Sequence, residues 1–207
     1  PRFKVNADVT PESMYASGWK CAGTAVPVFS LRTEDSFGIG DFHDLKKLVD
    51  WVVATGQRVI QLLPVNDTTM TGTWVDTYPY SANSIYALHP QFVYLPDAGV
   101  RRDSSYKALK AELEALPELD YERVNAEKDR LMRKAFSATW AKVSKSPEYK
   151  EFVKVNANWL DAYCAFRILL HKTGTGDTSK WGKYASYSEK KVAAVLAADR
   201  AEADYHA

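Results

Sequence analysis

Cysteine and histidine are scarce in this chain of 207 residues, which contains 2 Cys and 4 His. Cys21 and Cys164 lie far apart, whereas a secreted disulfide scaffold would carry more cysteines, so we expect a protein of the reducing cytoplasm. So few scattered thiols and imidazoles also make a poor metal site. We therefore predict no metal and no cofactor.

Excess charge and long apolar runs are absent as well. The formal net charge is +1, which creates no strong field for nucleic acid or for an anionic membrane. No stretch approaches the ~18 consecutive apolar residues of a membrane-spanning helix, and the first twenty residues have no apolar signal-peptide core. We expect neither nucleic acid nor a membrane among the partners.

Aromatic residues are plentiful, with 13% of the chain in Phe, Trp and Tyr, including 6 Trp and 12 Tyr. Aromatic faces stack on sugar rings, but they fill protein cores more often, so the count alone supports sugar binding weakly. The composition changes near residue 100. The chain is apolar and rich in loops before that point, and highly charged with helical periodicity after it.

The first half predicts a strand, a helix and a second strand. The apolar runs 24–31 and 58–65 are typical of strands that are buried on both faces, although Pro27 lacks the amide that a central strand needs. The segment between them is amphipathic, with Asp41 as its N-cap and Gly56 as its stop. A helix between two such strands indicates a βαβ unit with parallel strands.

The second half predicts helices. Their expected positions are 106–116, 120–143, a helix opened by Ser146 and Pro147, a largely buried helix at 158–172, and a last helix from Ser188 toward the end of the chain.

The glycine-containing loop 36–41 (SFGIGD) stands between the first strand and the helix. A dinucleotide fingerprint would need a third glycine where His43 stands, and Asp41 would repel a phosphate at the helix N-terminus. A tight turn into a capped helix is the better interpretation, and a nucleotide-dependent α/β enzyme is disfavoured.

A loop of about twenty residues follows the second strand, and its length favours a functional role. It contains Trp74, Tyr78 and Tyr80 together with many hydroxyl groups. That mixture suits a neutral, hydroxyl-rich ligand.

Two stretches carry a family resemblance: VPVFSLRTEDSFGIGDFHDLKKLVDWVVATGQRVIQLLPVNDTT at 26–69 and YPYSANSIYALHP at 78–90. In this order they resemble the opening of the 4-α-glucanotransferases, glycoside hydrolase family 77. The Tyr-Pro-Tyr-Ser loop and the Asn-Asp pair are closest to the branch of plant cytosolic and Bacteroides-type enzymes.

The resemblance implies an α/β fold, the opening βαβ portion of a (β/α)₈ TIM barrel followed by a mostly α-helical insertion. We expect a linker or remnant at 1–17, the first strands and helix of the barrel at 18–100, and the insertion at 101–207. A barrel opening without its remaining strands would expose apolar surface, through which the chain could self-associate.

The family performs a retaining transfer of α-1,4-glucan segments, with an aspartate nucleophile and a glutamate acid/base. No carboxylate here matches their motifs, so we assign no catalytic residue and expect this segment alone to be inactive. The resemblance places Tyr80 at the subsite that holds the transferred sugar. Asp67 and Asn83 are weaker substrate-binding candidates that could equally stabilise the loop. The alternative function is a noncatalytic α-glucan-binding module.

Other conspicuous side chains have structural interpretations. We expect His89, before Pro90, to shape a turn and Cys164 to behave as a small hydrophobe. Trp140, Trp159 and Trp181 could form a second sugar platform, but core packing is favoured.

Overall fold

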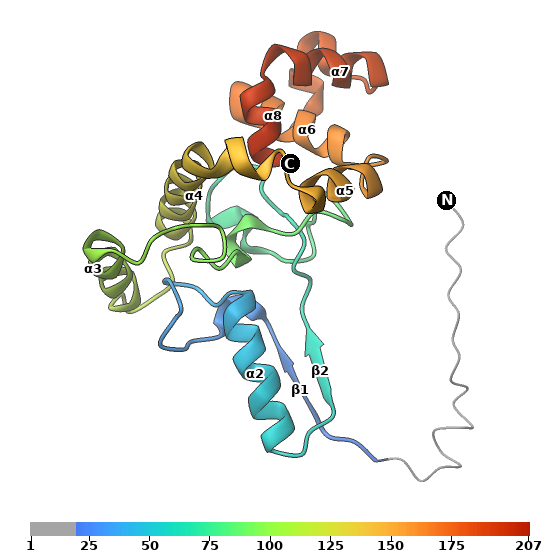
Figure 1. Cartoon of the computed structure of the whole chain (residues 1–207). Helices are drawn as coiled ribbons and strands as arrows, with labels where there is room; N and C mark the ends of the chain where they lie inside the picture. Colours follow the sequence, from blue (N-terminus) through green and yellow to red (C-terminus); the bar gives the residue numbers. More distant parts are fainter. Residues whose placement is uncertain (1–19) are drawn as a thin grey trace.

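The computed structural model describes residues 20–207 (Figure 1), so the expected linker at 1–17 lies outside the described residues. A small parallel sheet with one long helix beside it forms one end of the molecule. Helices α5–α8 form the other end, and α3, α4 and irregular segments lie between them. None of the helices in the described part has the length and hydropathy of a membrane span.

The predicted βαβ unit with parallel strands is confirmed. Strands β1 (Gly23–Val26) and β2 (Val59–Leu62) pair in parallel, with Gly23 opposite Val59 and Val26 opposite Leu62. Helix α2 (Phe42–Ala54) connects them and contacts β2.

The strands are shorter and more exposed than the sequence predicts. Pro27 ends β1 and caps a 3₁₀ turn at Val28–Ser30, because proline cannot donate the next ladder hydrogen bond. The expectation that both strands are buried on both faces is also wrong: Val59 and Leu62 are 41% and 37% exposed. The side-chain faces of a sheet are covered by elements packed on it, and α2 is the helix that packs on β2, so part of the sheet remains open to solvent.

The ends of α2 agree with the prediction. Asp41 accepts hydrogen bonds from the amides of His43 and Asp44, and the Asp44 side chain accepts one from the Asp41 amide, which forms a reciprocal capping box. Gly56, at φ +75°, follows the helix in the left-handed conformation that stops it.

The loop 36–41 packs closely against the 3₁₀ turn at Val28–Ser30 and against α3 and α4. A Cβ on Gly40 would lie 2.1 Å from the Val28 carbonyl oxygen, and one on Gly38 would lie 2.9 Å from Val124. The Gly38 amide donates to the carboxylate of Glu114. These contacts support the interpretation of the glycines as a close-packed turn.

The helices of the second half lie within a few residues of their predicted positions. They are α3 (Ser104–Glu114), α4 (Tyr121–Val143), α5 (Pro147–Val155), α6 (Leu160–Thr173), α7 (Glu189–Ala198) and α8 (Arg200–His206). The prediction of one last helix is wrong. Asp199 leaves the helical conformation at φ −147° and ψ 67°, and its carboxylate caps α8 through the Glu202 amide.

The described chain has two hydrophobic clusters. The first joins the glycine loop to α3 and α4 through buried residues that include Phe37, Ile39, Leu95 and Val124. The second joins α6, α7 and α8 and includes the predicted hydrophobe Cys164, which is 2% exposed. The helical half therefore has a core of its own.

The packing at Gly40 generates a test. Gly40→Ala should lower the free energy of unfolding by about 3 kcal/mol, because the new methyl group meets rigid backbone. Gly56→Ala is the matched control, since open space surrounds Gly56 and only its left-handed φ is strained, at about 1 kcal/mol. Urea unfolding would measure both, and equal losses would contradict the close-packed turn.

Candidate functional site

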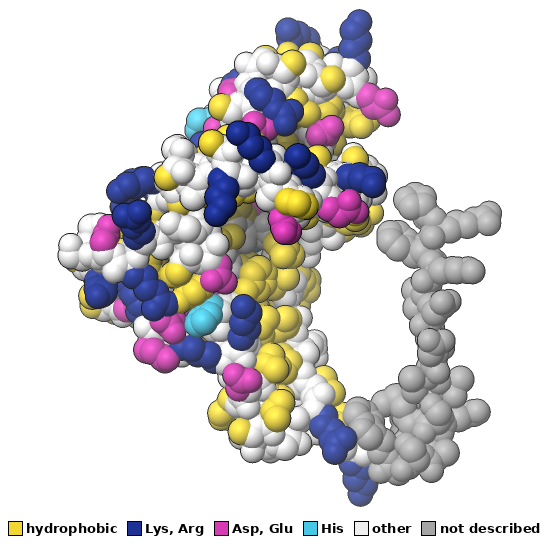
Figure 2. Space-filling model, viewed as in Figure 1, with side chains coloured by type: hydrophobic (Ala, Val, Ile, Leu, Met, Phe, Trp, Pro, Cys, Tyr) yellow, Lys and Arg dark blue, Asp and Glu magenta, His cyan; other side chains and the backbone are white. Residues whose placement is uncertain are grey.

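Residues 63–89, termed here the aromatic loop, connect β2 to the 3₁₀ turn at Pro90–Phe92 and contain four of the seven large aromatic side chains that are exposed in the described part of the protein. Its exposed apolar side chains are Trp74, Val75, Tyr78, Tyr80, Ile85, Tyr86 and Leu88. Figure 2 shows a band of hydrophobic side chains between the helical part and the βαβ unit, with charged side chains mostly outside it. Such a patch is typical of a binding surface.

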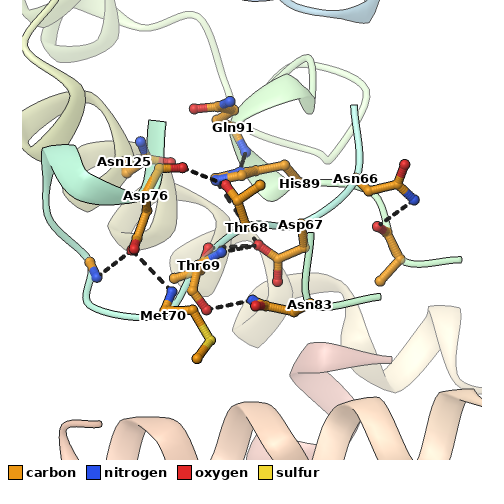
Figure 3. A network of polar contacts seen from close by, with 12 residues as sticks. Asn66, Asp67, Thr68, Thr69, Met70, Asp76, Asn83, His89, Gln91 and Asn125 are labelled. Carbon is orange, nitrogen blue, oxygen red and sulfur yellow. Dashed lines mark hydrogen bonds and ion pairs between the residues drawn. The ribbon is translucent and has the colours of Figure 1, made fainter. Parts of the chain in front are cut away.

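Asp67 anchors the start of this loop and is 0% exposed (Figure 3). Its Oδ1 accepts hydrogen bonds from the amide and hydroxyl of Thr69, at 3.0 and 2.6 Å. Its Oδ2 accepts from the Tyr163 hydroxyl at 2.7 Å and from Arg167 Nη1 at 2.8 Å, both on α6. The carboxylate therefore joins the loop to the helical half.

Charge pairing keeps Asp67 ionised. Burial alone would raise its pKa, but the Arg167 guanidinium, together with the donors around the carboxylate, outweighs burial and holds the pKa below its usual value. With both oxygens engaged, Asp67 has the loop-stabilising role that the sequence left open. A direct contact with a sugar stays a prediction.

Asp76 organises the middle of the loop from inside. Its carboxylate is 5% exposed and accepts hydrogen bonds from the consecutive amides of Met70, Thr71 and Gly72 at 2.7–3.2 Å. Its carbonyl oxygen accepts from the Thr68 hydroxyl. The segment 68–76 is thus folded onto one buried acid.

Asn83 closes the other side of the loop. Its amide donates to the Asp67 carbonyl oxygen at 2.7 Å, and its side-chain Nδ2 donates to the Thr69 carbonyl oxygen at 2.6 Å. A bridge between Asn66 and Leu88 fixes the two ends of the loop side by side. Asn83 therefore also serves the loop, and its contact with substrate stays a prediction.

Tyr80 lies between the anchors Asp76 and Asn83 and is 61% exposed. Its ring centroid is 5.5 Å from that of Tyr78, at 51° between the ring planes. The structure therefore places the predicted sugar-contacting residue in an exposed pair of tyrosines on a fixed frame.

A second buried network lies beneath the loop. His89 is 3% exposed, and its Nδ1 accepts from the Gln91 amide while Nε2 lies 3.0 Å from the Tyr121 hydroxyl. Burial is the main cause that lowers the pKa of His89 to about 4, so the ring is neutral at pH 7. The prediction that His89 shapes a turn is confirmed, since it caps the 3₁₀ turn at Pro90.

Lys128 on α4 extends this network toward α2. It is 0% exposed, donates to the Gln91 carbonyl oxygen at 2.5 Å and lies 4.0 Å from Asp41 Oδ2. Burial lowers its pKa to about 8, against the attraction of Asp41. The residue ties the helical half to the capping box of α2.

The sequence alone did not indicate that Tyr121, Lys128, Tyr163 and Arg167 lie at the candidate site. One usable signal was Arg167, which is a lone charge within the apolar segment 162–170 and therefore needed a buried partner. Nothing in the sequence indicated that its partner would be Asp67, one hundred residues away.

A cleft of about 640 Å³ separates the aromatic loop from helices α4, α5, α6 and α8. At its rim the ring of Tyr86 stacks on Trp159, with centroids 5.6 Å apart and 16° between the planes. Trp181 is 9% exposed and Trp159 packs against the second hydrophobic cluster, which confirms core packing for these two, whereas Trp140 is half-buried and packs on Phe136 and Tyr149 outside both clusters.

The profile of one protein family, described as 4-alpha-glucanotransferase (glycoside hydrolase family 77), matches residues 26–207. The chain belongs to this family. The match extends through the helical half, so helices α3–α8 also belong to the region that the family shares. Whether that half is an insertion within a barrel stays a prediction.

Individual relatives agree with this assignment. The chain is 42% identical to the 4-alpha-glucanotransferase DPE2 of rice (Oryza sativa subsp. japonica) over 181 residues, which are 85% of this chain and 19% of that protein. It is 32% identical to the 4-alpha-glucanotransferase of Chlamydia pneumoniae over 185 residues, 84% of this chain and 34% of that protein.

A solved structure shares the fold. The amylomaltase from Streptococcus agalactiae in complex with acarbose superposes with a TM-score of 0.73 at 19% identity, over 90% of this chain and 37% of that one. The chain therefore spans between about a fifth and a little over a third of the length of these 4-α-glucanotransferase relatives.

The ion pair between Asp67 and Arg167 can be tested by truncation. Arg167→Ala should lower the free energy of unfolding by about 3–5 kcal/mol, because it leaves a buried carboxylate unpaired. The double variant Asp67→Asn/Arg167→Met should lose less, since neither charge remains. Chemical denaturation of the three proteins would measure this, and a loss below about 1 kcal/mol in Arg167→Ala would show that the pair does not hold the loop.

The buried His89 predicts acid sensitivity. Since its pKa is about 4 in the folded chain and 6.5 in the unfolded chain, stability is retained above pH 6.5 and falls as the pH drops toward 4. The loss from His89 should reach roughly 3 kcal/mol at pH 4, at about 1.4 kcal/mol per pKa unit. Unfolding curves at several pH values would measure it. His89→Gln should show a shallower decline, and an unchanged decline would exclude His89 as its source.

Proposed function

We propose that the natural protein carrying this sequence is a retaining 4-α-glucanotransferase, which transfers α-1,4-glucan segments between maltooligosaccharides or to glucose and glycan acceptors. Membership of the family supports this proposal, as does the name of each relative described above. The structural neighbour was solved with acarbose bound, which supports maltooligosaccharides as the ligand class.

The observation that carries the proposal is the fixed but exposed tyrosine pair. Tyr78 and Tyr80 present their rings to solvent, while hydrogen bonds of the buried Asp67 and Asp76 and of the half-buried Asn83 hold the backbone on either side. A rigid aromatic platform can stack on the apolar face of a glucose ring at little cost in conformational entropy. Tyr80 is the proposed substrate contact, with Asp67 and Asn83 as its supports and weaker candidates for contact.

The proposed fold of the whole enzyme is a (β/α)₈ barrel that opens with β1, α2 and β2. In such a barrel the loop that follows a strand lies on the catalytic face, which is where the aromatic loop would stand. The exposed Val53, Val59 and Leu62 would face other parts of the barrel, and in their absence could cause self-association.

The transfer chemistry needs two carboxyl groups about 5 Å apart, one as nucleophile and one as acid and base. Asp67 and Asp76 of the aromatic loop do not suit these roles, because their carboxylate oxygens already accept hydrogen bonds from other groups of the protein. We place the catalytic pair outside this chain. Tyr80 would help to exclude water, so that a glucan hydroxyl intercepts the glycosyl-enzyme intermediate.

A noncatalytic α-glucan-binding module is the second candidate. The same engagement of Asp67 and Asp76 favours it for this segment taken alone, because a binding surface needs the tyrosines but no free acid. Scarce cysteine supports a cytoplasmic location for either candidate.

Tyr80 gives the direct test. In the natural protein, Tyr80→Ala should lower kcat/KM for disproportionation of maltotriose by about tenfold and raise the fraction hydrolysed to glucose, because a stacking face and a barrier to water are both lost. Chromatography of product chain lengths would measure both quantities.

Tyr80→Phe is the matched control, since it keeps the ring and should retain most of the transfer. Wild-type kinetics in Tyr80→Ala would remove Tyr80 from the site. A wild-type protein that binds maltotriose without redistributing it would favour the noncatalytic module.

A further inference from the structure

A second aromatic groove lies in the helical half, away from the aromatic loop. It is formed by α6, α7 and the segment 178–188 between them, and we term it the α6–α7 groove. Its volume is about 300 Å³, at the lower end of the range for small-molecule sites.

The floor of this groove is apolar and well packed. Phe166 on α6 lies against Trp181, with ring centroids 5.5 Å apart, and Trp181 Nε1 donates to the Thr175 carbonyl oxygen at 2.8 Å. Leu169 and Val192 complete the floor. Because Trp181 is held by its own hydrogen bond and is 9% exposed, it supports the groove and leaves ligand contact to its neighbours.

The wall of the groove offers aromatic faces to solvent. Tyr187 is 74% exposed, the most exposed large apolar side chain in the described part of the protein, and Tyr184 is half-buried beside it. The Lys183 ammonium lies 5.0 Å from the centre of the Tyr184 ring, which helps to hold that ring. Tyrosine combines an apolar face with a hydroxyl at its edge, as the face and rim of a pyranose ring require.

The groove carries almost no free charge. Lys191 is its one ionisable lining group besides the tyrosines, and its ammonium donates to the Ser186 carbonyl oxygen at 3.0 Å and to Ser186 Oγ at 2.7 Å. The remaining polar groups on the rim are hydroxyls, those of Thr178, Ser186 and Ser188. Such a surface matches a neutral, hydroxyl-rich ligand better than an ionic one.

From these features we propose that the α6–α7 groove is a noncatalytic glucan-binding site, which holds a short stretch of an α-1,4-linked glucose chain against Tyr184 and Tyr187. The choice of a glucan rests on the proposed function. Such a site would keep a long polymer attached through the helical half while its end reaches the aromatic loop, so it would matter for glycogen and little for maltotriose.

Retardation of the natural protein in native gels that contain glycogen tests the site directly. Tyr187→Ala should weaken glycogen binding roughly 3- to 10-fold, the loss expected for one aromatic stacking face. The side chain is so exposed that its removal should leave the fold unchanged. Tyr187→Phe should keep most of the binding, because it keeps the stacking face and loses only the hydroxyl. Lys190→Ala should bind as the wild type does, since Lys190 is a neighbouring exposed residue that does not line the groove.

Each outcome decides one question. Weaker retardation in Tyr187→Ala alone supports the site, whereas wild-type retardation in Tyr187→Ala overturns it. Equal weakening in Lys190→Ala would also overturn it, because the effect would then be unrelated to the groove. Transfer from maltotriose is measured separately on the same wild-type sample. Failure there would overturn the proposed enzyme activity and would leave the glycogen result standing.

Discussion

The ion pair between Asp67 and Arg167 is the interaction on which the candidate site depends. An isolated carboxylate cannot remain ionised without solvent, so Asp67 needs the guanidinium, and Arg167 needs Asp67 for the same reason. The two residues are one hundred positions apart and belong to different halves of the chain. Their mutual requirement therefore fixes the aromatic loop to α6 as well as to β2.

Lys128 is a second buried charge that is stabilised by polar partners far away in the sequence. Its buried ammonium lies between the Gln91 carbonyl oxygen and the capping box of α2. Together the two buried cations link α4 and α6 to the first half of the chain by polar contacts, alongside the hydrophobic cluster that joins the glycine loop to α3 and α4. Buried polar contacts need a defined geometry, so they specify how the parts fit together more strictly than apolar contacts do.

Local features of the fold could be predicted from the sequence, because they arise from neighbouring residues. Asp41, Gly56, Ser146 and Gly174 all cap or end helices as their residue types indicate. The break at Asp199 was missed, since alanine-rich sequence on both sides masks a single capping aspartate. The strand lengths were overestimated because apolar content does not reveal where a ladder hydrogen bond fails.

The site was predictable only in part. The aromatic and hydroxyl content of the loop was visible in the sequence, and Tyr80 is exposed in the structure, while its contact with a sugar stays a prediction. The partners of Asp67 could not be found, because the pairing depends on tertiary contact between residues far apart in sequence. The two polar residues singled out beside Tyr80 both have structural hydrogen bonds: those of Asn83 lie within the loop, and those of Asp67 join the loop to α6.

The arrangement of the aromatic loop also bears on how the protein can evolve. Its anchors are the buried Asp67 and Asp76 and the half-buried Asn83, while the hydrogen bonds and ring contacts of residues 77–82 are made within the loop itself. The side chains that hold the loop in place are therefore different from those that the proposed function assigns to glucan contact. Substitutions at 77–82 would leave these anchors intact, so under the proposed function this stretch is where sugar preference can diverge or be engineered.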